Sequence, residues 1–408
     1  MKSDLDRLMA ARDLDAIIIM GPSPDNYPLR YMTNFAHIGD GIVVKKRGEP
    51  PSLVCGSMER EEAAKSGLPT ETYADYRLLD LIGQSGSPAE GRLLMLAEIL
   101  KRHGISGHAA FYGRSEPSEG YHVLARMSEL VPGLQVDASV GRTVIDDACL
   151  TKDPAEIAAL KDVAARTNTV MAEVVEFIKR HKVKDSTLVQ DDGSPLTVRD
   201  VKRFLRARLY ERDLEHDGEP IFAIGRDAGI PHSHGEPTDP LVLGKSIVFD
   251  LFPRALDTGY LHDMTRTFCL GFAPPEVKAA YDQVARIFFD VAETLAPGVL
   301  CSKLQNQVCD FFQEHGHQTI RDNTRTEEGY VHGLGHGVGF EIHEAPMMQY
   351  YSKDVLQPCQ VVTVEPGLYY PSRGFGVRVE DTFLIDEQGE AHSLSPFPKD
   401  LVIPVSGS

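Results

Sequence analysis

Four acidic residues of this chain stand in apolar, strand-like stretches, where carboxylate side chains are unusual. They are Asp250 after SIVF, Asp263 within GYLHDMTRTF, Glu365 within VVTVEPG, and Glu380 after GVRV. Burial of an unpaired carboxylate costs several kcal/mol, so four of them in one region need a common source of positive charge. Arg266 and Arg378 could neutralise two of the acids, whereas a pair of divalent cations could neutralise all four.

Each acid alone also has an ordinary explanation. An aspartate at a strand end is commonly a turn or cap residue, and Asp263 could pair with Arg266, which follows three positions later. Side chains alternate along a strand, so either Glu380 or the adjacent Asp381 must face the opposite side, where we expect solvent. The joint pattern of four acids and a nearby histidine favours a metal site. Oxygen ligands with one imidazole suit Mn, Co, Fe or Zn, and an oxygen-rich set favours two ions.

The histidine belongs to a glycine-rich segment, residues 332–346, with the sequence HGLGHGVGFEIHEAP. It contains three histidines (His332, His336 and His343) and four glycines (Gly333, Gly335, Gly337 and Gly339). Glycine lets a backbone pass close to a crowded centre or adopt a positive φ, and His336 could then reach a metal. A mobile surface loop is the alternative. The glycine spacing does not match a GxGxxG nucleotide-binding motif.

The elements that must position these residues begin near residue 150. Asp153, Pro154 and Glu156 form a predicted helix start with a capping box, followed by one apolar stripe through about residue 178. Residues 184–197 look like an exposed excursion. Further helices are predicted at about 197–212, 274–298 and 302–316, and strands at 246–252, 259–271, 360–370 and 376–386. We therefore predict an α+β domain over residues 151–408, with helices that cover one side of a sheet.

Residues 1–150 instead alternate between helix-like and strand-like segments. A buried strand is predicted at 14–20, a hairpin at 41–56, a helix at 88–103 that ends at Gly104, and another strand at 108–113. This pattern predicts a separate, smaller α/β domain.

Composition and charge exclude several classes of partner. The chain has 408 residues and a formal net charge of −18, which disfavours nucleic acid and anionic membranes as main partners. The charged N-terminus contains only a short apolar run, which fits neither a signal peptide nor a membrane span. The six cysteines are scattered without a CxxC pair, so we expect a cytoplasmic protein with reduced thiols.

These motifs together resemble the metallopeptidase family of Xaa-Pro dipeptidases (prolidases), aminopeptidase P and methionine aminopeptidase, with creatinase as a relative. The matching segments are VFDLF…GYLHDMTRTF, HGLGHGVGFEIHEAP, TVEPGLYY and GVRVEDTFLI, in family order. The resemblance implies a C-terminal pita-bread domain with a dinuclear metal centre. Residues 1–150 resemble the smaller N-terminal domain of the prolidase and creatinase branch.

Carried onto this sequence, the resemblance implies five metal ligands: Asp250, Asp263, His336, Glu365 and Glu380. Glu365 would also act as general acid–base. His343 would contact the scissile carbonyl, and His234 would be a second active-site histidine. His332 and Arg378 match supporting positions.

The hairpin between the two aspartates departs from the family pattern. Asp250 and Asp263 are 13 residues apart in sequence, two more than is common in relatives. An even-numbered insertion preserves which face each side chain occupies, so the assignment survives, with Asp257 as a competitor for the first ligand.

The implied activity is cleavage of the peptide bond before proline in short peptides, by an Xaa-Pro dipeptidase that uses two divalent ions. Manganese is the first expectation, with cobalt, zinc or iron as alternatives, and a homodimer is expected from the family. An aminopeptidase P-type enzyme, or a non-peptide hydrolase or lyase on the same fold, stays open. A binding module without catalysis is disfavoured, because such relatives have generally lost metal ligands.

Overall fold

The computed structural model describes residues 1–23, 25–216 and 218–405, which divide into two compact units. The first unit ends at Cys149 and the second begins at Leu150. Among the described residues, no helix combines the length and the apolar character that crossing a membrane requires. The two units are described separately below.

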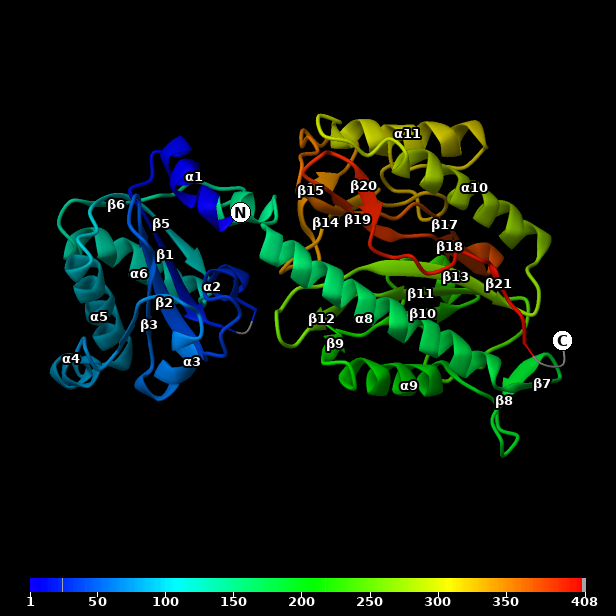
Figure 1. The fold of residues 1–408 in the computed structure, drawn as a ribbon, viewed down its shortest axis with the longest axis horizontal. Helices are drawn as coiled ribbons and strands as arrows, with labels where there is room; N and C mark the ends of the chain where they lie inside the picture. The colour runs from blue at the N-terminus through cyan, green and yellow to red at the C-terminus, as the bar shows by residue number, and fades with distance from the viewer. Residues whose placement is uncertain (24, 217, 406–408) are drawn as a thin grey trace. The chain divides into compact units, whose positions relative to one another are not determined.

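The first unit is built around a six-stranded mixed sheet with the order β4-β3-β2-β1-β5-β6 (Figure 1). Strand β1 (Ala16–Pro22), in the interior of this sheet, carries three fully buried residues in a row, Ile17, Ile18 and Ile19. The strands are β1 (Ala16–Pro22), β2 (Asp40–Lys46), β3 (Ser52–Cys55), β4 (Thr70–Thr72), β5 (Gly107–Gly113) and β6 (Leu134–Val136). The helices are α1 (Leu5–Ala11), α2 (Tyr27–Met32), α3 (Arg60–Ala64), α4 (Leu78–Ser85), α5 (Pro88–Arg102), α6 (Pro117–Leu130) and α7 (Val144–Cys149). The predicted α/β class of this unit is confirmed.

The second unit opens on the long helix α8 (Pro154–Lys179), whose predicted start is confirmed. The Asp153 carboxylate accepts hydrogen bonds from the backbone N–H groups of Ala155 and Glu156, and Glu156 accepts one from the Asp153 N–H, which completes a capping box. The remaining long helices are α9 (Val198–Tyr210), α10 (Pro275–Ala292) and α11 (Cys301–Glu314).

The strands of the second unit form several small sheets rather than one. A four-stranded sheet has the order β10-β11-β13-β21, and a five-stranded sheet has the order β15-β14-β16-β19-β20. The first comprises β10 (Ile221–Ile224), β11 (Ser246–Leu251), β13 (Met264–Leu270) and β21 (Val402–Ile403). The second comprises β15 (Glu344–Met348), β14 (Gly335–Gly337), β16 (Val361–Val364), β19 (Asp381–Ile385) and β20 (Ala391–Ser393). Three strand pairs complete the unit: β12 (Pro253–Ala255) with β9 (Leu214–His216), β17 (Gly367–Tyr370) with β18 (Phe375–Arg378), and β7 (Lys182–Lys184) with β8 (Thr187–Val189).

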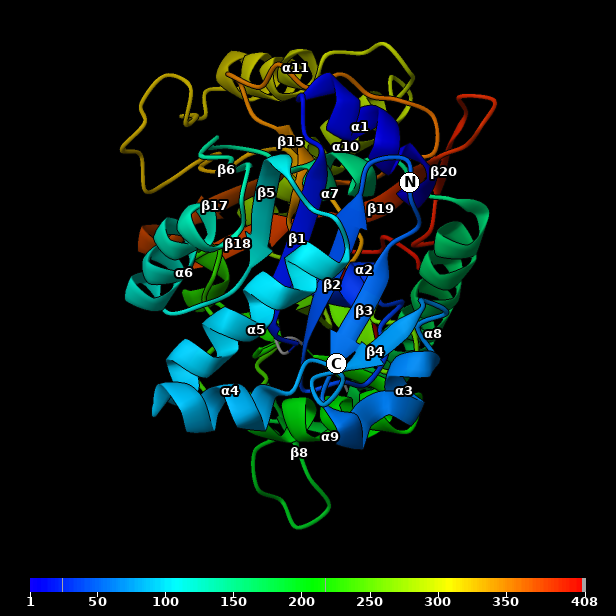
Figure 2. The ribbon, with the colours of Figure 1, turned by 90° about the vertical axis from the view of Figure 1, so that its left-hand side faces the viewer.

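Helices cover the strands of this unit from two sides. Helices α8 and α9 lie on one side and α10 and α11 on the other, in both views (Figures 1 and 2). The two pairs pack against different strands: α8 and α9 contact β9, β10 and β12, whereas α10 and α11 contact β15, β16, β17 and β18. The predicted α+β class, with helices that cover strands, is confirmed. The segment 184–197 is not the exposed excursion that was predicted, because strand β8 carries the buried Leu188, whose N–H donates to the carbonyl of Leu241.

Three of the four conspicuous acids lie at breaks between strands, not within them. Asp263 directly precedes β13, Glu365 follows β16, and Glu380 separates β18 from β19. Pro366, which cannot donate a backbone hydrogen bond, interrupts the predicted strand 360–370. Glu380 marks the point at which the chain leaves its pairing with β17 and begins to pair with β16.

Strand register brings the acids to one face. Asp250 is the cross-strand partner of Thr265 in the antiparallel pair β11–β13, and Thr265 also forms a bridge with Glu380. Partners directly opposite each other in antiparallel strands point their side chains to the same side. Asp250, Thr265 and Glu380 therefore share one face, although up to 130 residues separate them along the chain.

Part of the glycine-rich segment, Gly335–Gly337, forms β14, an inner strand of the five-stranded sheet, and the segment continues through a turn into β15. A Cβ added at Gly335 would lie 2.2 Å from the carbonyl oxygen of Thr363, and one at Gly337 would lie 2.3 Å from that of Ala345. Neither glycine has a positive φ. The glycines therefore serve close approach of neighbouring backbone, the first of the two predicted reasons.

Candidate metal centre

A cavity of about 450 Å³ lies in the second unit, where β11, β14 and the segments after β16 and β18 come together. The nine residues to which the resemblance assigns a role all line it: Asp250, Asp263, His336, Glu365, Glu380, His234, His332, His343 and Arg378. Residues more than 140 positions apart in sequence thus converge on one cavity.

Asp263, His336 and Glu380 form the tightest group in this cavity. Each offers one ligand atom, and these atoms lie within 4.8 Å of one another. His336 Nε2 is 3.7 Å from Asp263 Oδ2 and 3.6 Å from Glu365 Oε1. All of these side chains are largely shielded from solvent. The spacing is that of atoms around a shared ion rather than of direct hydrogen bonds.

Several carboxylate oxygens in the group lack a hydrogen-bond donor. Asp250 Oδ1, Asp263 Oδ1 and Glu380 Oε1 are buried, and none of the described residues donates to them. Buried polar atoms in folded proteins are nearly always satisfied, so unpaired anionic oxygens require another partner. Hard divalent cations prefer such oxygens, and the residues present therefore fit a metal site.

The ionisation of these acids shows the same imbalance of charge. Burial, followed by the neighbouring carboxylates, raises the pKa values of Asp263 and Glu380 well above their usual range. Burial raises the pKa of Glu365 to about 8, even though Arg378 acts to lower it. Arg378 is held by Asp250, with 2.6 Å between Nη2 and Oδ2. One arginine does not compensate four buried acids.

His336 is arranged to present a lone pair to the same point. Its Nδ1 is 3.1 Å from the carbonyl oxygen of Gly337, which accepts a hydrogen bond from the protonated Nδ1 and leaves Nε2 facing the acids. Burial, followed by the nearby His343, lowers the pKa of His336 to about 3. The imidazole is therefore neutral at physiological pH, which is the form that binds metal ions.

A series of hydrogen bonds links His332 to Glu380 and holds the Glu380 carboxylate in place. The Tyr369 hydroxyl lies 2.9 Å from His332 Nε2 and accepts from Arg378 Nη1 at 2.9 Å. Arg378 Nε donates to Thr265 Oγ1 at 3.0 Å, and Thr265 Oγ1 donates to Glu380 Oε2 at 2.6 Å. This chain fixes one oxygen of Glu380 and leaves the other facing the cavity.

The mouth of the cavity carries the remaining histidines. His234 and His343 are exposed side chains that line the cavity, and the His343 ring packs edge-on against His336 with 4.4 Å between ring centroids. Apolar side chains, including Ile221 and Phe252, form part of the wall. A substrate could therefore reach the acids past two imidazoles that can donate hydrogen bonds.

Comparison with known proteins identifies the family. Residues 158–387, more than half of the chain, match the model of metallopeptidase family M24. The chain is a member of family M24. Membership implies divalent metal ions, in agreement with the unpaired oxygens described above.

Individual relatives cover the chain to different extents. The chain is 35% identical to an Xaa-Pro dipeptidase of Pyrococcus furiosus over 172 residues, which are 42% of this chain and 45% of that protein. It is 25% identical to an Xaa-Pro dipeptidase of Pyrococcus horikoshii over 389 residues, 93% of each chain. The solved structure of an Xaa-Pro dipeptidase from Bacillus anthracis superposes with a TM-score of 0.77 at 23% identity, over 98% of this chain and 99% of that one. The predicted α+β architecture, an M24 pita-bread domain after a smaller α/β domain, is confirmed.

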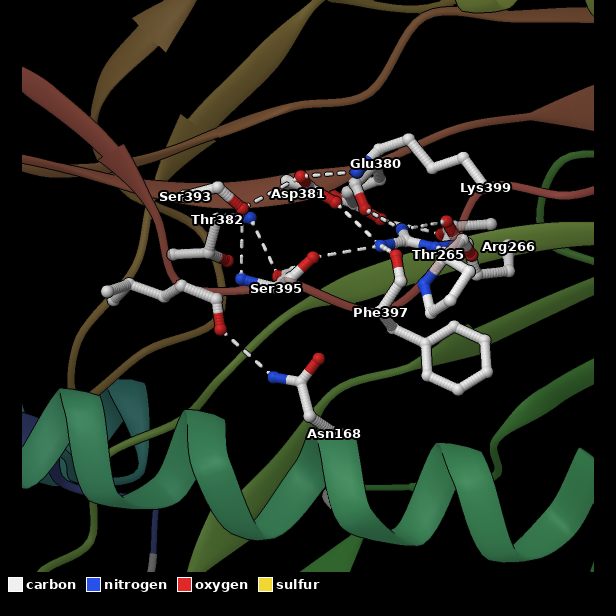
Figure 3. A network of polar contacts seen from close by, with 12 residues as sticks. Asn168, Thr265, Arg266, Glu380, Asp381, Thr382, Ser393, Ser395, Phe397 and Lys399 are labelled. Carbon is white, nitrogen blue, oxygen red and sulfur yellow. Dashed lines mark hydrogen bonds and ion pairs between the residues drawn. The ribbon is translucent and has the colours of Figure 1, made fainter.

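One prediction about the acids of this M24 member was wrong. Asp381 faces away from the cavity, but it does not face solvent: its side chain is 2% exposed and forms ion pairs with Arg266 at 2.9 Å and Lys399 at 2.7 Å (Figure 3). Arg266 consequently neutralises Asp381 and none of the four conspicuous acids, although it also donates to the backbone carbonyl of Glu380. The sequence could not show that residues near position 399 cover this side of β19.

Two further outcomes concern residues near the centre. Asp257, the weighed competitor of Asp250, is exposed, forms an ion pair with Arg166 at 3.1 Å and does not line the cavity. His232 and Tyr369 were not predicted from the sequence. His232 lines the cavity, and the Tyr369 hydroxyl lies within hydrogen-bond distance of His332. The HSH triplet at 232–234 and the tyrosines directly after Glu365-Pro-Gly-Leu were the available signals.

Proposed function

We propose that this chain is an Xaa-Pro dipeptidase that uses two divalent metal ions, manganese first, with cobalt, zinc or iron as alternatives. The observation that carries the proposal is the convergence of buried carboxylates with unpaired oxygens and one neutral imidazole in a single cavity. The proposed ligands are Asp250, Asp263, His336, Glu365 and Glu380. Residues 151–408 would be the catalytic domain, and residues 1–150 an N-terminal domain of the prolidase and creatinase type.

The proposed roles of the side chains come from the family resemblance and are supported by where these side chains lie. Bound divalent ions supply Lewis acidity and activate water near neutral pH. Glu365 lies at the cavity and would take a proton from the attacking water and deliver one to the leaving nitrogen. His343, at the mouth, would donate a hydrogen bond to the oxygen on which negative charge develops. His234 would hold the substrate, while His332 and Arg378 would fix the acids through Tyr369 and Thr265.

The substrate class is supported by the names of the relatives. Two Xaa-Pro dipeptidases align with this chain, one of them over 93% of its length. An aminopeptidase P-type activity on longer peptides, and a non-peptide reaction on the same cavity, are the alternative functions. A homodimer in the cytoplasm is the accompanying proposal, tested by light scattering of the purified protein and by cell fractionation.

The deciding experiment compares two substrates on one preparation. Protein purified without chelator is analysed for metal by mass spectrometry and then assayed with Mn²⁺ or Co²⁺ on Ala-Pro and on Ala-Pro-Ala. We expect two ions per chain and hydrolysis of the dipeptide. Preferential cleavage of the tripeptide would assign the chain to the aminopeptidase P type, and inactivity on both peptides would refute Xaa-Pro cleavage. Glu380→Ala is the matched control, expected to lose both metal and activity.

A further inference from the structure

Glu344 follows His343 directly but is turned away from the cavity. His343 is exposed and lines the cavity, whereas Glu344, the first residue of β15, is only 8% exposed and is not among the lining residues. Adjacent residues at the start of a strand point to opposite sides, so the two side chains serve different surroundings. The metal centre does not use Glu344.

The Glu344 carboxylate fills the turn that carries His343. Its Oε1 accepts hydrogen bonds from the backbone N–H groups of Phe340 at 2.7 Å and Glu341 at 3.1 Å. A Cβ added at Gly339 would lie 2.5 Å from Oε2, so the glycine at 339 leaves room for the carboxylate inside the turn. The turn at 339–344 thus has an acidic side chain as its core.

Lys152 neutralises this carboxylate from the start of the second unit. Its Nζ lies 2.7 Å from Glu344 Oε2, and the two side chains are 2% and 7% exposed. The backbone N–H of Lys152 donates to the carbonyl of Cys359 at 2.7 Å, just before β16. A buried charge left without its partner is strongly unfavourable, so neither side chain can leave while the other remains. The pair therefore ties the His343 turn to a fixed point of the domain.

The position of the His343 ring depends on this turn. Among the described residues, none forms a hydrogen bond with the His343 imidazole, and its one ring contact is the edge-on packing against His336. The outer side of the turn is held by the guanidinium of Arg254, which donates to the Phe340 carbonyl at 2.8 Å, and by the Tyr260 ring, 4.5 Å from that of Phe340. The backbone, not a side-chain partner, aims His343.

We infer that Lys152 and Glu344 are positioning residues that aim His343 at the substrate. The inference rests on the proposed peptidase function, in which His343 stabilises charge in the transition state. A ring displaced by about 1 Å would still permit substrate and metal binding but would lose much of that stabilisation. The pair should therefore act on kcat and not on metal content.

The test is a double-mutant cycle between Glu344→Gln and His343→Ala. Glutamine keeps an oxygen that can accept from Phe340 and Glu341 but removes the charge that Lys152 pairs with. With a cleaved Xaa-Pro dipeptide, we expect Glu344→Gln to lower kcat about 10- to 100-fold, to change KM less than about threefold, and to retain the wild-type metal content. In the His343→Ala background the same substitution should change kcat less than about twofold.

Lys152→Met and a control lysine sharpen the test. Lys152→Met should lower kcat as Glu344→Gln does. In the His343→Ala background, Lys152→Met should leave kcat nearly unchanged. Lys202 on α9 is also a buried lysine, 2% exposed and 3.0 Å from Glu219, although Glu219 is 41% exposed; among the described contacts none joins this pair to the turn. Lys202→Met should lower stability without lowering kcat. If Lys152→Met does not fold, the double-mutant cycle with Glu344→Gln still tests the positioning role of the pair.

The outcomes that overturn the inference are distinct from failure of the proposed function. Equal losses of kcat with and without His343, loss of metal from Glu344→Gln, or an unaffected kcat would each overturn the positioning role while the wild type stays active. A wild type that cleaves no Xaa-Pro peptide would instead overturn the proposed function, and this inference with it.

Discussion

Glu380 and Asp381 are neighbours in sequence and both are buried, yet they lie in opposite electrostatic surroundings. Asp381 forms ion pairs with Arg266 and Lys399 and accepts a hydrogen bond from Ser393 at 2.8 Å (Figure 3). Glu380 accepts one hydrogen bond, from Thr265, and its other oxygen faces a cavity lined by further acids. One carboxylate is neutralised by the protein, and the other is not.

The difference shows what distinguishes the proposed metal ligand, Glu380, from the structural acid, Asp381. Burial is the same for both side chains, with Glu380 1% and Asp381 2% exposed, so burial alone does not separate them. What separates them is the positive charge within reach on each side of β19. The charge of a buried acid such as Asp381 is balanced by basic side chains of the protein itself. A buried acid without such partners needs a cation from solution to balance its charge.

The largest expected effect is on metal binding and catalysis. Glu380→Gln should lose metal and lower kcat/KM about 1000-fold, equivalent to about 4 kcal/mol of transition-state stabilisation. Asp381→Asn, where it remains folded, should retain the wild-type metal content, because the Asp381 side chain does not face the cavity. Metal analysis beside steady-state kinetics measures both, and equal metal loss in the two variants would abolish the distinction.

The same two substitutions should change folding stability in opposite directions. Asp381→Asn leaves Arg266 and Lys399 with a buried excess of positive charge and should cost about 3–5 kcal/mol. Glu380→Gln removes one of several mutually repelling acids, so metal-free protein at pH 8.5 should become more stable. Urea unfolding of both chelator-treated variants and of the wild type gives the sign of each change in the free energy of unfolding. A destabilised Glu380→Gln would indicate that the cavity acids are compensated after all.

The pH dependence of metal-free protein should report the cavity acids. Burial raises the pKa of Glu365 from 4.5 to about 8 in the folded state, so the stability that its protonated form contributes is complete below pH 4.5 and is lost as the pH rises through 8. Above about pH 7.5 an unfolded-state histidine, whose ordinary pKa is near 6.5, is largely neutral, so the range from pH 7.5 to 8.5 reports mainly the acids. The free energy of unfolding should fall by on the order of 1 kcal/mol over that range. Added Mn²⁺, or Glu365→Gln, should flatten this slope in thermal or urea unfolding.

The smallest expected effect comes from the hydrogen bonds that link Arg378, Thr265 and Glu380. Thr265→Val removes the hydroxyl that donates to Glu380 and accepts from Arg378, and should weaken metal affinity about tenfold. Thr265→Ser keeps the hydroxyl and should bind metal as the wild type does. Metal titration followed by calorimetry compares the two, and identical affinities would show that Thr265 does not hold the acid in place.

The sequence predicted the helices, the capping box at Asp153 and the convergence of the acids with His336, because each leaves a local signature of spacing or residue type. It did not predict which side of β19 is covered, because Arg266 and Lys399 come from distant parts of the chain. It also placed three acids inside strands, because an apolar run continues through the break at Pro366 and through Glu380. Interactions at long sequence separation and changes of strand partner leave no periodicity to read.

The narrow contacts at Gly335 and Gly337 have a consequence for ion selection. Carbonyl oxygens of Thr363 and Ala345 lie about where a Cβ of Gly335 or of Gly337 would stand, so the backbone of β14 is packed directly against the neighbouring backbone and cannot move closer to it. The imidazole of His336 is thus carried on a rigid support, while carboxylates can rotate about their side-chain bonds. We expect ions of different radius to be accommodated by rotation of the acids, with the histidine as the fixed reference point of the coordination sphere.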